Sequence, residues 1–180
     1  MKTLVLGGYG NFGARISRAL AADAAIELLV GGRDLERATA FAQSLAGRAR
    51  AVRVDAQSPD LAQGLGYLGV DLVIHTAGPF QNQDYRVPQA VAAAGAHYID
   101  LADGRRFVCD FPAALDGVFR GAGRTAVTGA STVPALSRPR ARRRTPATRR
   151  CNARPASAPA IARRHPRHRP RRRRATRRCA

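Results

Sequence analysis

The strongest chemical signal lies in residues 8–13, where glycine recurs with the spacing G-x-G-x-x-G. Gly8 suits a tight turn, Gly10 the close approach of a pyrophosphate, and Gly13 the close packing of a helix on a strand. An apolar run precedes the segment and a helical pattern follows it, which is the context that a dinucleotide site requires. We therefore predict that phosphate oxygens bind at this helix N-terminus; the alternative is a glycine-rich turn without a ligand. The predicted contacts are Gly8, Tyr9, Gly10, Asn11, Phe12 and Gly13.

Arg33 and Asp34 bear on which dinucleotide is bound. An NAD site usually has an acidic residue about 20 residues beyond the glycines, where it binds the ribose 2′-hydroxyl. Arg33 stands near that position, and a guanidinium suits the 2′-phosphate of NADP by charge and by geometry. Asp34 follows directly and is able to bind a ribose, so NADP is the predicted cofactor and NAD remains an alternative. The structural alternatives are a solvated arginine and a helix cap.

Two further strand ends are predicted to contact the cofactor. Asp55 and Ala56 end the third predicted strand, where such folds place the adenine, although a polar strand end without a ligand explains them equally well. The loop after the fourth strand is predicted to lie beside the nicotinamide, because its glycine permits close approach and its proline stiffens the backbone. The alternative is a loop shaped only by its turn residues. The loop consists of Thr76, Ala77, Gly78 and Pro79.

The sequence identifies no catalytic residue. His75 continues an apolar strand and is predicted to be a hydrogen-bonded core residue. Three charged residues cluster after the fifth strand: Asp100, Asp103 and Arg105. They are candidate substrate contacts; the simpler alternative is an ordinary salt-bridged loop. Cys109 lacks the neighbours that mark a reactive thiolate. The cysteines have neither disulfide-framework nor zinc-site spacing, which predicts no metal and a reducing cytoplasm; they are Cys109, Cys151 and Cys179.

Strand and helix patterns alternate along the first 130 residues and predict an α/β protein. Continuous apolar strands joined by helices indicate a doubly wound parallel sheet, the Rossmann fold, whose ligand lies beyond the carboxyl ends of the strands. The predicted strands are 3–7, 26–30, 51–54, 71–75, 97–101 and 125–128. The predicted helices are 11–22, 34–47, 59–68, 85–94 and 111–120.

Charge divides the chain into two parts. Its 180 residues carry 31 Lys and Arg against 12 Asp and Glu, a net charge of +19, and 18 of the arginines lie in residues 138–180. Such a segment cannot bury enough apolar surface to fold. We therefore predict a dinucleotide-binding domain at 1–137 and a disordered Arg- and Pro-rich tail at 138–180. No apolar run approaches the ~20 residues of a membrane span and no signal peptide is evident, which predicts a cytoplasmic protein without membrane contact.

Five segments together resemble the saccharopine dehydrogenase family, in particular bacterial proteins with a saccharopine dehydrogenase-type NADP-binding domain. They are residues 5–13, 32–34, 71–81, 97–104 and 129–137. The resemblance covers residues 1–137 and implies an NAD(P)-dependent oxidoreductase that transfers a hydride to or from a small imine, amine or carbonyl compound. It also implies that the 8–13 and 76–79 loops surround the cofactor, but it assigns no catalytic residue.

The resemblance stops after Ser137, where the family continues into a substrate and dimerisation region. The arginine- and proline-rich composition that follows here is what a GC-rich gene yields when read out of frame. We therefore predict a truncated or frameshifted chain that lacks most of its substrate site and the family-type homodimer. One alternative is a non-catalytic dinucleotide-binding module or redox sensor. Another is non-specific nucleic-acid binding by the tail, since no aromatic residue interleaves its arginines.

Overall fold

The computed structural model describes residues 1–45 and 49–131. The predicted domain boundary at Ser137 and the predicted disorder of residues 138–180 lie outside the described residues. Within them, the predicted architecture is confirmed: strands and helices alternate, and every strand of the sheet is parallel to its neighbours.

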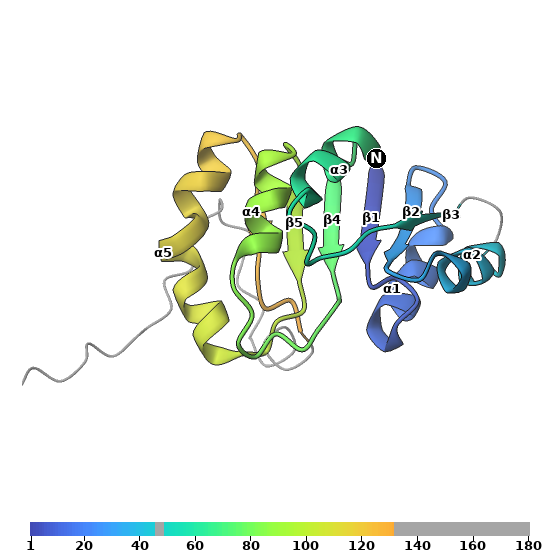
Figure 1. Cartoon of the computed structure of the whole chain (residues 1–180), viewed down its shortest axis with the longest axis horizontal. Helices are drawn as coiled ribbons and strands as arrows, with labels where there is room; N and C mark the ends of the chain where they lie inside the picture. Colours follow the sequence, from blue (N-terminus) through green and yellow to red (C-terminus); the bar gives the residue numbers. More distant parts are fainter. Residues whose placement is uncertain (46–48, 132–180) are drawn as a thin grey trace, which may run out of the picture.

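Six strands form one sheet in the order β3-β2-β1-β4-β5-β6 (Figure 1). They are β1 (Lys2–Leu6), β2 (Glu27–Gly32), β3 (Ala49–Arg53), β4 (Leu72–His75), β5 (His97–Asp100) and β6 (Ala126–Val127). The chain builds outward from β1 to β3 and then returns to place β4 on the other side of β1. The strand order therefore reverses between β1 and β4, which is where doubly wound sheets bind their ligands.

The helices cover both faces of this sheet, because right-handed crossovers in opposite directions place their helices on opposite faces. Alternate residues of β1 point into different cores: Leu4 packs with α3, α4 and α5, whereas Val5 packs with α2. Successive strand residues face opposite sides of a sheet, so the continuous apolar run in β1 fills both cores. The helices are α1 (Asn11–Ala21), α2 (Leu35–Gln43), α3 (Leu61–Leu68), α4 (Arg86–Ala93) and α5 (Arg105–Gly121).

Three predicted helix boundaries were wrong. Helix α2 ends at Gln43 rather than near residue 47, and α3 begins at Leu61 rather than at Pro59. Helix α5 begins at Arg105, six residues before the predicted start at 111, and runs through Pro112. Burial at four-residue spacing along α5 offsets the hydrogen bond lost at the proline. The buried residues of α5 are Phe107, Phe111, Leu115 and Phe119.

No helix among residues 1–45 and 49–131 is both long and apolar enough to cross a membrane.

Candidate functional site

The turn that leaves β1 is built around Gly7, which is not among the residues predicted from the sequence. Gly7 has a φ of +83°, a conformation that favours glycine. Its N–H and that of Gly8 both donate to the carbonyl of Gly31, at 2.8 and 3.1 Å. The tight turn predicted at Gly8 is thus made by the residue before it. The Gly7–Gly8 pair, and the three-residue spacing from Gly7 to Gly10 to Gly13, are the signals that could have identified it.

Gly8 and Gly13 are required by the protein's own packing. A Cβ at Gly8 would lie 2.8 Å from the carbonyl oxygen of Val5. A Cβ at Gly13 would collide with the carbonyl of Gly7 and lie 2.7 Å from Oγ1 of Thr76. These two glycines bring α1 close to the ends of β1 and β4, which is the packing role predicted for Gly13.

Gly10 has no such packing constraint. A Cβ there would meet, within 4 Å, the carbonyl oxygen of Gly7 at 3.2 Å and nothing else in the described part of the chain. Gly10 is also the N-cap of α1 and provides no side-chain cap, so the first amides of the helix are open to a ligand. Phe12 stands beside them with 62% of its surface exposed. The free space and uncapped amides fit a dinucleotide pyrophosphate.

The end of β2 separates the roles of Arg33 and Asp34. The Asp34 carboxylate accepts the N–H of Arg37 at 3.0 Å and caps α2, which was the structural alternative for this residue. The Asp34 N–H donates to the Tyr9 hydroxyl at 3.2 Å, and the Arg37 guanidinium lies 5.1 Å from the Tyr9 ring centroid. Arg33 is exposed and makes no hydrogen bond or ion pair with other residues in the described ranges, so its guanidinium is available to a phosphate.

Asp55 and Ala56 lie where predicted, at the carboxyl end of the edge strand β3. Asp55 is exposed and its carboxylate accepts the N–H of Gln57 at 2.9 Å, while Ala56 is half-buried. Contact of these residues with an adenine remains a prediction.

Hydrogen bonds connect the loop after β4 to the end of β1 and to the side chain of Gln83. The Thr76 hydroxyl donates to the carbonyl of Leu6 at 2.9 Å, which joins the loop to the end of β1. Gln83, not selected from the sequence, donates its side-chain amide to the carbonyls of Ala77 at 3.1 Å and of Pro79 at 2.7 Å. Hydrogen bonds with Leu6 and Gln83, which lie outside residues 76–79, therefore stabilise the conformation of this loop.

A cavity of about 520 Å³ opens between this loop, α1 and the ends of β5 and β6. Its lining is largely apolar, and its charged side chains are Arg15 and Asp103. One oxygen of Asp103 accepts the Gln81 side-chain amide at 3.0 Å. The cavity is lined by Phe12, Arg15, Ile16, Thr76, Gly78, Pro79, Phe80, Gln81, Leu101, Asp103, Ala130 and Ser131. Five of these were predicted from the sequence: Phe12, Thr76, Gly78 and Pro79 as cofactor contacts and Asp103 as a candidate substrate contact.

Asp100 does not join Asp103 and Arg105 in a surface cluster, because it is fully buried. Arg105 is exposed and forms no ion pair with either aspartate in the described ranges. The salt-bridged loop expected here is thus absent from residues 1–45 and 49–131.

His75, Tyr98 and Asp100 form a buried polar group between β4 and β5. His75 Nδ1 lies 3.0 Å from the Tyr98 hydroxyl. Burial lowers the pKa of His75 to about 4, which agrees with the predicted core histidine. Burial also raises the pKa of Tyr98, and it raises that of Asp100 against the opposing effect of hydrogen bonds from Gly129 and Ala102. No member of this group lines the cavity.

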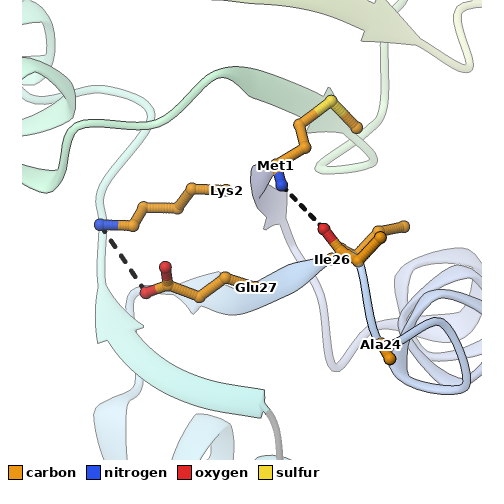
Figure 2. Close-up of a pocket in the computed structure, with 6 residues that line it drawn as sticks. Met1, Lys2, Ala24, Ile26 and Glu27 are labelled. Atoms are coloured by element: carbon orange, nitrogen blue, oxygen red, sulfur yellow. Dashed lines mark hydrogen bonds and ion pairs between the residues drawn. The ribbon is translucent and has the colours of Figure 1, made fainter.

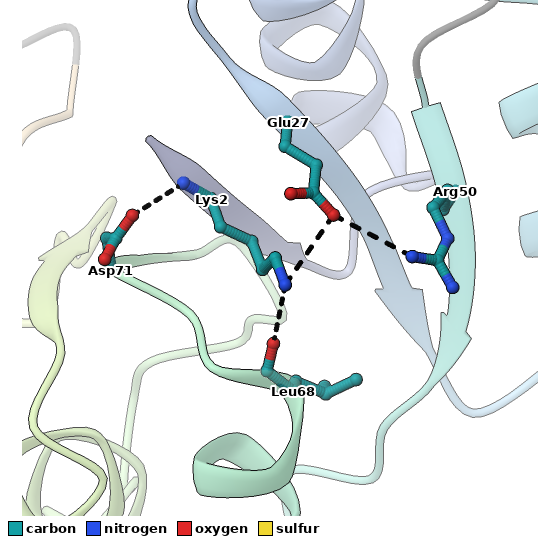
Figure 3. A network of polar contacts seen from close by, with 5 residues as sticks. All are labelled: Lys2, Glu27, Arg50, Leu68 and Asp71. Carbon is teal, nitrogen blue, oxygen red and sulfur yellow. Dashed lines mark hydrogen bonds and ion pairs between the residues drawn. The ribbon is translucent and has the colours of Figure 1, made fainter.

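A second hollow, of about 480 Å³, lies at the amino ends of β1 and β2 (Figure 2). The Met1 amino group donates to the Ala25 carbonyl at 2.7 Å beside it. Figure 3 shows the adjoining polar contacts, in which Glu27 lies 3.7 Å from Lys2 and 3.8 Å from Arg50. These partly exposed pairs join strand starts at the edge opposite the glycine turn. Parallel sheets of this kind bind ligands at the carboxyl edge, so this hollow is not the candidate site.

Within residues 1–45 and 49–131, no group of three His, Cys, Asp or Glu side chains lies close enough together to hold a metal ion.

Comparison with known proteins places this geometry in context. A family model described as the saccharopine dehydrogenase NADP-binding domain matches residues 3–153. The structure is similar to apo saccharopine dehydrogenase (L-Glu forming) from Saccharomyces cerevisiae, with a TM-score of 0.58 and 20% identity over 74% of this chain and 28% of that one. It is also similar to 3-hydroxyacyl-CoA dehydrogenase type-2 from Mycobacterium avium, with a TM-score of 0.57 and 17% identity over 71% of each chain. At these identities the structural likeness shows the fold alone. No curated protein sequence matches the chain significantly.

Proposed function

Since the chain belongs to the family of saccharopine dehydrogenase NADP-binding domains, we propose that it binds NADP(H) across the carboxyl edge of its sheet for hydride transfer. The family establishes NADP as the cofactor and an oxidoreductase-type dinucleotide domain as the class of protein. The chain covers 28% of the yeast enzyme's length, so the substrate and the turnover are proposals. The proposed substrate is a small imine, amine or carbonyl compound.

The observation that carries this proposal is the open space at Gly10, because it lies between two features suited to opposite ends of a dinucleotide. On one side, the exposed Arg33 at the end of β2 offers a guanidinium that pairs with no residue in ranges 1–45 and 49–131. On the other side, Phe12 and Thr76 line the apolar cavity. A pyrophosphate at Gly10 would place the adenosine toward Arg33 and the nicotinamide toward the cavity.

Each segment of the edge then has a part in holding the cofactor. The amides at the start of α1 bind the pyrophosphate, Arg33 binds the 2′-phosphate, and Asp55 lies near the adenine. The loop of residues 76–79 and the side chain of Phe12 shield the nicotinamide from water. The cofactor supplies the hydride when bound, and the protein supplies orientation and exclusion of water. Gln81 and Asp103 offer the substrate polar contacts at the cavity rim.

A non-catalytic dinucleotide-binding module is the second candidate. It is favoured by the position of the buried titratable groups: His75, Tyr98 and Asp100 have shifted pKa values but do not line the cavity. A proton donor for substrate reduction would have to come from elsewhere. Binding of NADPH without oxidation by any aldehyde, ketone or imine in a panel would favour this candidate over the enzyme.

The test of cofactor binding uses the full chain and the fluorescence of NADPH. Gly10→Ala should weaken NADPH by about tenfold or more, roughly 1.4 kcal/mol, since the added methyl occupies the space of the pyrophosphate. The backbone of Gly10, with a φ of −77°, suits alanine, and the added methyl has one close neighbour, the Gly7 carbonyl oxygen at 3.2 Å, which has to shift by a few tenths of an ångström. Circular dichroism and a denaturant titration of the variant verify that it is folded. Gly66→Ala on α3 is the matched control, because its added Cβ would meet no described atom outside its own helix within 4 Å, and it should bind as the wild type does. Equal affinity of the Gly10 variant and the control would overturn the proposed pyrophosphate site.

A further inference from the structure

The Asp100 carboxylate is fully buried, and in the described part of the chain no lysine or arginine forms an ion pair with it. A buried carboxylate needs hydrogen-bond donors in place of water. Besides a side-chain hydrogen bond with Tyr98 on β5 itself, Asp100 receives them from two loops, one that follows β5 directly and one that follows β6. Hydrogen-bond donors thus stabilise the charge in place of a cation, and those from the two loops tie Asp100 to segments that line the cavity.

The first stretch is the turn after β5. The N–H of Ala102 donates to Oδ1 of Asp100 at 3.0 Å. This bond closes the turn between Leu101 and Asp103, and both of those residues line the cavity.

The second stretch follows β6, which consists of two residues and cannot by itself hold what comes after it. The Thr128 hydroxyl lies 2.9 Å from Oδ2 of Asp100, and the Gly129 N–H donates to Oδ1 at 2.8 Å. The backbone carbonyl of Asp100 accepts the N–H of Ala130 at 2.9 Å. Ala130 and the following Ser131 line the same cavity.

From this geometry we infer that Asp100 is a positioning residue for the nicotinamide side of the site. One carboxylate fixes the two loops that form the cavity wall opposite α1, so their separation depends on its charge and shape. On the adenosine side, the Gly7 turn is held by hydrogen bonds to the Gly31 carbonyl and Asp34 by hydrogen bonds with Tyr9 and Arg37, so neither depends on Asp100. The inference rests on the proposed function, because it assigns the cavity to the nicotinamide.

The test compares two ligands that share the adenosine half. NADPH occupies the whole site, whereas 2′,5′-ADP lacks the nicotinamide. Asp100→Asn keeps the volume but removes the charge and leaves a single acceptor oxygen for the N–H groups of Ala102 and Gly129 and the hydroxyl of Thr128, which in the wild type share two. We expect it to weaken NADPH by about tenfold, to reduce the change in nicotinamide emission on binding, and to leave 2′,5′-ADP unchanged. Asp116→Asn, in an exposed pair with Arg120 on α5, is the matched control and should alter neither ligand.

Thr128→Val removes one donor and leaves the carboxylate in place, so it carries the test if Asp100→Asn does not fold. It should show the same selective loss for NADPH in smaller degree. Wild-type affinity of both variants for NADPH, or an equal loss of 2′,5′-ADP, would overturn the positioning role while leaving the proposed function intact. Failure of the wild-type chain to bind either ligand would overturn the proposed function, and the positioning role with it.

Discussion

The carboxyl edge of the sheet has two halves that are constructed differently. At the β1–β2 half, the surface offered to a ligand is backbone and exposed side chain: the open space at Gly10, the amides of α1 and the guanidinium of Arg33. At the β4–β6 half, the surface is the wall of a cavity, and its loops are held by the side chains of Gln83 and Asp100.

This difference has a consequence for mutation. In the β1–β2 half, the residues proposed to contact the cofactor are largely those of the local glycine motif. In the β4–β6 half, Gln83 and Asp100 do not line the cavity but bind the loops that do. Substitutions in the β1–β2 half should therefore either remove a contact with the cofactor or prevent folding. Substitutions of Gln83 or Asp100 in the β4–β6 half should instead weaken cofactor binding by moving the loops that line the cavity.

The largest expected effect is on folding, at Gly13. Gly13→Ala places a methyl against the Gly7 carbonyl, a backbone atom that cannot move without displacing the turn. We expect a loss of roughly 3 kcal/mol of unfolding free energy or an insoluble product, measured by denaturant titration. Gly117→Ala on α5 is the control, because its Cβ would meet nothing within 4 Å beyond its own helix in the described part of the chain; it should be neutral or slightly stabilising. A Gly13 variant as stable as this control would show that the turn is not rigid.

The buried histidine predicts how stability depends on pH. His75 has a pKa of about 4 when folded against 6.5 as its ordinary value, so between these pH values the unfolded chain binds a proton that the folded chain does not. Stability should therefore fall as the pH is lowered from 6.5 toward 4, by at most about 3 kcal/mol. Asp100, whose pKa is raised, has the opposite sign: its protonation in the folded state offsets part of the loss.

The measurement is the unfolding free energy of the wild type and of His75→Gln at several pH values in this window. The variant lacks the titrating group, so its stability should depend less steeply on pH even if its absolute stability is lower. Parallel curves for the two proteins would show that His75 is not the group responsible.

A substitution of Arg33 tests the β1–β2 half, which is proposed to bind the adenosine. Arg33→Ala should weaken NADPH by roughly 1.5–3 kcal/mol, the value of a hydrogen bond to a charged group, and leave NADH nearly unchanged. Isothermal titration with both cofactors measures the difference. Arg50→Ala, at the amino end of the sheet, removes an arginine of similar exposure and should change neither affinity. Equal losses for NADPH and NADH would mean that Arg33 does not contact the 2′-phosphate.

A substitution of Gln83 is expected to change affinity least, and it tests the β4–β6 half, which is proposed to bind the nicotinamide. Gln83→Ala frees the carbonyls of Ala77 and Pro79, so NADPH should weaken by about 1 kcal/mol and 2′,5′-ADP should not. Competition between the two ligands reports both values. Gln63→Ala on α3, where the amide contacts the exposed Tyr67, is the control. A loss shared by both ligands would remove the distinction between the two halves.

Much of the β1–β2 half of the carboxyl edge could be predicted from the sequence, because the residues that form it are close together in the chain. The glycine spacing, the strand before it and the helix after it lie within residues 2–21. Even there, the choice between Gly7 and Gly8 for the turn needed backbone angles, because both glycines tolerate either conformation. That the Asp34 carboxylate caps α2 likewise depended on where it points, and its contact with a ribose stays a prediction.

The sequence by itself determined the alternation of strands and helices, the doubly wound parallel sheet and the segment that contains the glycine turn, because hydrophobic period and glycine spacing are local properties. Tertiary structure alone decided that Asp100 is buried, that Gln83 supports the loop after β4, and that Leu101 and Ala130 line one cavity. These facts depend on pairs such as Thr128 and Asp100, which are 28 residues apart and become neighbours through the pairing of β5 with β6. Local patterns carry no information about which distant donor will meet a given carboxylate.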